Sequence, residues 1–97
     1  MTNFDPTMTL KLSIQRALLG EITDRFVAVT CGIENRILRI RAYVFGKCSE
    51  DDVERVQRIG AEVIADFTEG YKIEESCISI ENQVPVILDF WAFKRAD

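Results

Sequence analysis

The 97-residue sequence contains no histidine, only two prolines, and no apolar run long enough to cross a membrane. Histidine is the side chain most used for acid–base catalysis near neutral pH and the commonest zinc ligand, so its absence argues against an enzyme. The N-terminus also lacks the basic and apolar regions of a signal peptide. We therefore expect a cytoplasmic protein that has no catalytic residues and does not bind a membrane.

The motifs of common cofactor and metal sites are missing as well. The sequence has no Gly-rich phosphate loop, no C-x-x-C pair, no G-x-S-x-G and no H-E-x-x-H. Three widely spaced cysteines, Cys31, Cys48 and Cys77, are typical of reduced structural thiols. The acids of residues 50–52 follow Ser49, a pattern that favours the start of a helix over a metal site. We predict no cofactor and no metal.

Length and composition predict one folded domain over residues 1–97. The chain is shorter than an average domain, and its 47% hydrophobic and 29% charged residues are close to globular averages. This composition excludes a disordered tail and a collagen-like fibre.

Charge is unevenly distributed along the chain. Residues 50–81 hold ten acidic and three basic residues, a net charge of −7, whereas residues 1–49 carry a net charge of +3. The whole chain has a net charge of −4, and such an acidic protein is repelled by phosphate backbones. We therefore expect no direct binding of nucleic acid, and a basic protein is the easier partner.

Hydrophobic periodicity predicts two helices and four strands. Apolar residues recur at helical spacing before Gly20 and Gly70, which are suited to end helices. Alternating or β-prone segments predict the strands, and turn residues are expected at 32–35. The predicted helices are 7–19 and 50–69, and the predicted strands are 22–31, 36–45, 72–81 and 86–95.

The element order α-β-β-α-β-β predicts an α+β fold, a two-layer sandwich in which both helices cover one face of a four-stranded sheet. We expect the sheet to be mainly antiparallel, with the first strand paired to the second and the third to the fourth. The open face would then display Arg39, Arg41, Tyr43 and Phe45, together with Leu88 and Phe90 or Trp91 and Phe93.

Four segments resemble a family of small bacterial proteins. They are RALLGEIT (Arg16 to Thr23), IRAYVFG (Ile40 to Gly46), AEVIADF (Ala61 to Phe67) and WAFKR (Trp91 to Arg95). The family comprises immunity proteins of contact-dependent growth inhibition and related polymorphic toxin systems. The resemblance implies a cytoplasmic protein that binds one cognate toxin domain, often a nuclease, and blocks its active site.

An acidic inhibitor is suited to such a partner, because nucleases hold phosphate backbones on basic surfaces. Exposed carboxylates would face the basic cleft of the toxin, and aromatic side chains would act as apolar anchors. The candidate carboxylates are Glu54, Glu62, Asp66, Glu69, Glu74 and Glu75, and the candidate anchors are Tyr43 and Trp91.

Three alternatives remain open from the sequence. Glu74 and Glu75 could instead pair with Arg39 and Arg41 across neighbouring strands. The chain could also be a structural or regulatory module that associates through a sheet edge, although we expect a monomer or a weak homodimer. Finally, it could bind a small molecule in a pocket with a perturbed carboxylate such as Asp89, which interrupts an apolar run.

Overall fold

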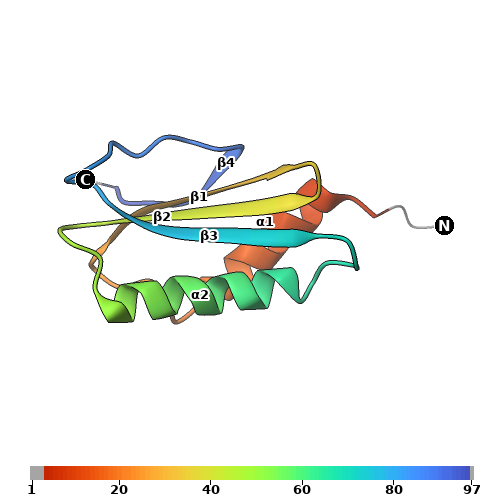
Figure 1. Ribbon diagram of the computed structural model, residues 1–97, viewed down its shortest axis with the longest axis horizontal. Coiled ribbons are helices and arrows are strands. Elements are labelled where there is room, and N and C mark those ends of the chain that lie inside the picture. Colours follow the sequence, from red (N-terminus) through yellow and green to blue (C-terminus); the bar gives the residue numbers. More distant parts are fainter. Residues whose placement is uncertain (1–3, 97) are drawn as a thin grey trace.

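The computed structural model describes residues 4–96. Its sheet forms one layer, and both helices lie on one face of that sheet (Figure 1), so the predicted α+β class and the position of the helices are confirmed. The elements along the chain are α1 (Pro6–Ala17), β1 (Phe26–Glu34), β2 (Ile37–Val44), α2 (Glu50–Ile64), β3 (Lys72–Ser79) and β4 (Phe90–Lys94).

Both helices begin where a side chain caps free backbone N–H groups. The Asp5 carboxylate accepts hydrogen bonds from the N–H groups of Thr7 and Met8. Ser49 and Asp52 form a reciprocal capping box at the start of α2. The two Asp5 bonds and the capping box each satisfy two donors, so local sequence explains both starts.

The end of α2 differs from the prediction, because the helix stops at Ile64 and not at Glu69. Asp66 accepts hydrogen bonds from the Ser13 hydroxyl and the Arg16 guanidinium of α1, and the Phe67 ring packs on Phe4. Residues 66 and 67 instead form i→i−3 hydrogen bonds to Val63 and Ile64, and their side chains make these contacts with the N-terminal segment, so tertiary packing accounts for the early end of the helix.

The sheet is mixed, with strand order β3-β2-β1-β4. The predicted hairpin of β1 and β2 is confirmed, but β2 and β3 are parallel, and β4 pairs with β1. The expected pairing of the third and fourth strands is therefore wrong, since they lie at opposite edges. The reason is that α2 acts as a crossover connection, which returns the chain parallel to β2.

Residues 80–89, here called the strap, connect these opposite edges. The strap runs over the face of the sheet that is away from the helices (Figure 1). Its backbone N–H groups at Val86 and Leu88 donate to the hydroxyls of Tyr43 and Thr30, at 3.3 and 2.9 Å. Tyr43 is consequently only 1% exposed, which corrects its expected place on an open face.

The β1–β2 turn also differs from the prediction. Gly32 lies inside β1, and the turn consists of Asn35 and Arg36, both with positive φ. A Cβ at Gly32 would lie 3.0 Å from the Asp89 carboxyl carbon of the strap. This glycine is therefore required for close packing of the strap and not for the turn.

The core lies between the sheet and the two helices. Both helices and the central strands contribute fully buried apolar side chains, and the bulkiest are listed here: Leu10, Ile14, Phe26, Val29, Leu38, Ile40, Val44, Val56, Ile59 and Val63.

Candidate functional site: the acidic helical layer

The position of α2 depends on Asp52, whose side chain is fully buried. Arg25 donates to both carboxylate oxygens from Nε, at 3.1 and 2.9 Å, and its NH2 group donates to the carbonyls of Phe45 and Lys47. Burial raises the pKa of Asp52, but the hydrogen bonds from Arg25 and Ser49 outweigh it and hold the pKa below its ordinary value. Arg25 thus ties the start of α2 to the β2–α2 loop.

Arginines between α1 and α2 are neutralised by carboxylates of the same layer. Arg58 donates to both oxygens of Glu21 at 2.9 Å, which lowers the pKa of Glu21. Arg55 contacts Glu21 and Asp51, and Arg16 pairs with Asp66. Because these cations already have partners, they do not offset the other acids of the layer.

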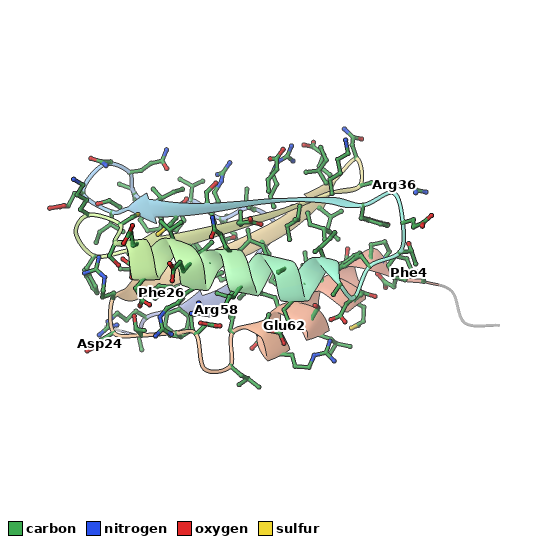
Figure 2. All side chains as sticks on the ribbon, turned by 60° about the horizontal axis from the view of Figure 1, so that its bottom comes forward. Phe4, Asp24, Phe26, Arg36, Arg58 and Glu62 are labelled. Atoms are coloured by element: carbon green, nitrogen blue, oxygen red, sulfur yellow. The ribbon has the colours of Figure 1, made fainter. Side chains whose placement is uncertain are left out.

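Apart from the helix cap Asp5, four exposed carboxylates of this layer have no ion-pair partner among the described residues: Glu50, Glu54, Glu62 and Glu69. Glu62 lies on the side of α2 nearest α1 (Figure 2). We define the helical layer as residues 5–21 and 50–69, which hold nine acidic and four basic residues, a net charge of −5. The rest of the chain holds seven acidic and eight basic residues, a net charge of +1. Folding therefore concentrates the negative charge on one face.

The predicted site residues are not all brought together. Glu54, Glu62 and Glu69 are exposed on the helical layer. Asp66 lies on the same layer but forms an ion pair with Arg16. Glu74 points away from the helices, and its carboxylate accepts from Arg39 Nε at 3.2 Å. This confirms the pairing expected for Glu74 and separates it from the helical acids.

Trp91 also lies on the face of the sheet opposite the helices. It is aligned with Thr30, whose hydroxyl contacts the strap, and Lys94 lies over its ring at 5.1 Å from the centroid. Together with the buried Tyr43, this placement separates both predicted anchors from the acids of α2.

Glu75 faces α2 and not Arg41, so the expected pairing with that arginine is wrong. It aligns with the core residue Ile40, and a Cβ at Gly60 would lie 3.0 Å from its carboxyl carbon. Its Oε2 is buried and has no hydrogen-bond partner among the described residues, and burial raises the pKa of this carboxyl. Gly60 leaves the space that Glu75 fills.

Glu75→Gln is expected to raise the free energy of unfolding at pH 7 by about 1 kcal/mol, because an ionised carboxylate oxygen then no longer lies buried without a partner. The folded pKa is raised, so the cost in the wild type appears as pH rises above the ordinary value of 4.5. Urea unfolding at pH 4 and pH 7 checks this: the gain should shrink at pH 4. Glu74→Gln, on the exposed face, is the control, and a similar gain there would contradict the interpretation.

The strap and the β1 end form a small hollow of about 280 Å³ around Asp89. The Asp89 carboxylate accepts a hydrogen bond from the Ile33 N–H at 2.9 Å and is exposed to solvent. This geometry gives Asp89 a structural role in holding the strap. Within residues 4–96, no group of three or more His, Cys, Asp or Glu side chains could hold a metal ion.

Two of the three cysteines, Cys31 and Cys77, have thiols with raised pKa values. All three are free thiols, and burial raises the pKa of Cys31 to about 12. Burial and the neighbouring Cys48 raise the pKa of Cys77 to about 12. Cys31 and Cys77 therefore remain protonated near neutral pH and are poor nucleophiles. No helix in the described part of the chain is long and apolar enough to span a membrane.

One feature of this layer was not predicted from the sequence. Met8 and Leu12, which lie on α1, and Leu19, which follows the C-cap residue Leu18, are large exposed apolar side chains. Met8 and Leu12 are four residues apart and therefore share the helical face opposite Leu10 and Ile14. The spacing of Met8 and Leu12 can be read from the sequence. The apolar stripe that includes Leu10 and Ile14 was sufficient to predict the helix, so the second apolar group was not recognised.

Comparison with known proteins identifies a family for the whole folded region. No curated protein matches the chain. The model of the MafI2 immunity protein family matches residues 7–97, which include every helix and strand after the first residue of α1. The chain therefore belongs to the MafI2 immunity protein family.

Proposed function

We propose that this protein neutralises a cognate toxin domain with nuclease activity by binding over its active site. Membership in the immunity protein family indicates an immunity function against a toxin. In this proposal the helical layer contacts the basic surface on which the toxin holds its phosphate substrate. The observation that carries it is the excess of acidic residues in the helical layer, whose net charge of −5 becomes −4 when the buried and paired Asp52 is left out.

The unpaired carboxylates make this face suitable for a basic partner. Glu54 and Glu62 belong to α2, and Glu69 follows it in the turn before β3. Because nearby arginines are already bound to Glu21, Asp51 and Asp66, the negative potential of the layer is not cancelled locally. Complementary potentials speed association and select the correct partner. Carboxylates in the toxin cleft would also occupy positions that substrate phosphates need.

Changing Glu54, Glu62 and Glu69 together to lysine is expected to slow association with the toxin domain at least about tenfold at low salt. The salt dependence of the association rate should also become weaker, since attraction between unlike charges is removed. Stopped-flow mixing with toxin domains encoded in the same gene cluster, at several salt concentrations, measures both quantities.

The matched control changes Glu34, Glu74 and Glu81 to lysine, which alters the net charge by the same amount on other parts of the surface. A clearly smaller effect of the control supports contact through the helical layer. Equal effects of the two triple variants would show that total charge, and not this face, drives association. Failure of the wild-type protein to bind or inhibit any of these toxin domains would overturn the proposed function.

A further inference from the structure

The exposed stripe of α1 is unusual for the surface of a small domain. Met8, Leu12 and Leu19 are 54%, 66% and 77% exposed. Met8 and Leu12 lie on one face of α1, and Leu19 follows the C-cap residue Leu18 at the end of the helix. Single exposed apolar residues are common, but a group of large ones marks an interaction surface.

A second apolar group lies on the strap, where Val84, Val86 and Ile87 are 77%, 56% and 46% exposed. The two groups differ in their electrostatic surroundings. The strap holds Glu81 and Asp89, but the part of the chain outside the helical layer has a net charge of +1. Within the layer, residues 5–21 balance two acids with two bases, so the net charge of −5 comes from residues 50–69, which include α2 packed beside α1. A basic partner that covers both helices is therefore attracted to the side of the molecule that carries the stripe.

The charges beside the stripe also decide between a toxin and a second copy of this chain. Arg16 is neutralised by Asp66, whose pKa is lowered by the Ser13 hydroxyl and by Arg16, and Lys11 lies over the Phe90 ring. Two copies that met through α1 would bring two acidic helical layers together, and their like charges would repel. The occupant that fits is a protein surface with apolar side chains set among lysines and arginines.

We propose that Met8, Leu12 and Leu19 form the apolar centre of the toxin-binding surface, and that the unpaired carboxylates of the helical layer form its charged rim. This inference rests on the proposed function and names the contact that holds the complex together. Binding energy concentrates in a few apolar residues that become fully desolvated, whereas rim charges act mainly on association. The stripe thus replaces Tyr43 and Trp91 as the expected anchor.

The double variant Leu12→Gln, Leu19→Gln tests this assignment. Both side chains are exposed, so the fold should be retained, and the unfolding midpoint verifies this. Surface plasmon resonance with the toxin domain should show affinity weakened about 100-fold, mainly through faster dissociation. The salt dependence of association should remain as in the wild type, in contrast to the triple lysine variant.

The double variant Val84→Gln, Ile87→Gln on the strap is the matched control and should change affinity less than about threefold. If the wild type binds the toxin but the α1 variant binds equally well, the surface assignment is wrong and the proposed function stands. If the wild type does not bind, the proposed function itself fails. If light scattering shows a dimer that the α1 variant converts to a monomer, the stripe binds a second copy and the inference is overturned.

Discussion

Asp52→Ala is expected to lower the free energy of unfolding by about 3 kcal/mol. The change removes a fully buried carboxylate, its hydrogen bonds to Arg25, and the capping box at the start of α2. Loss of the cap alone costs about 1 kcal/mol, and bonds between charged groups contribute more than neutral ones. Chemical denaturation of both proteins at pH 7 measures the difference.

The pH dependence distinguishes the ion pair from simple loss of packing. The folded pKa of Asp52 is lowered, so its contribution is present above the ordinary value of 3.8 and is lost as pH falls through the folded pKa. The stability difference between wild type and variant should therefore narrow in acid. Asp51→Ala removes an exposed partner of Arg55 in the same helical turn and should cost well under 1 kcal/mol. A comparable loss in this control would contradict a special role for Asp52.

Thr30→Val is expected to lower the free energy of unfolding by about 2 kcal/mol, although the two side chains have nearly the same shape. The buried Thr30 hydroxyl accepts from the Leu88 N–H at 2.9 Å and donates to the Phe90 carbonyl at 2.7 Å. Valine leaves both backbone groups without these partners. Hydrogen exchange followed by mass spectrometry should show the largest increase in residues 80–89.

Thr30→Ser provides the control, because it retains the hydroxyl and loses only a methyl group. It should keep the exchange protection of the strap and lose less stability than Thr30→Val. Equal exchange in the two variants would show that the hydroxyl does not hold the strap. The helical layer lies on the opposite face of the sheet, so toxin binding by folded Thr30→Val should be retained.

Asp52 and Thr30 stabilise opposite sides of the sheet, because Asp52 holds the start of α2 and Thr30 holds the strap. The strap buries Tyr43 and Thr30 and uses Asp89 to hold the β1 backbone. On the other side, the helices cover the core with one face and present carboxylates and the α1 stripe with the other. Within the helical layer, Asp52, which the fold requires, is buried, whereas Glu54, Glu62 and Glu69 of the proposed binding surface are exposed.

Short-range patterns in the chain were sufficient to predict the six elements, the β1–β2 hairpin and an acidic α2. Helical periodicity, the cap at Ser49 and alternation along 36–45 act over a few neighbouring residues, so they can be recognised without knowledge of the fold. The candidate acids Glu54, Glu62 and Glu69 were likewise predicted on an exposed helix or its end, because they fall outside the apolar stripe of 53–67.

Strand pairing, the strap and the grouping of the proposed binding residues depended on contacts between distant segments. The sequence of residues 86–95 does not determine whether this strand pairs with β1 or with β3, because the edge of every strand presents the same N–H and C=O groups. Asp66 forms an ion pair with Arg16, and the Glu75 carboxyl lies against Gly60. Tyr43 is buried because the strap crosses the sheet over it. Local backbone preference determines the elements, but burial and pairing are properties of the packed chain, and they decided which residues remain available to a partner.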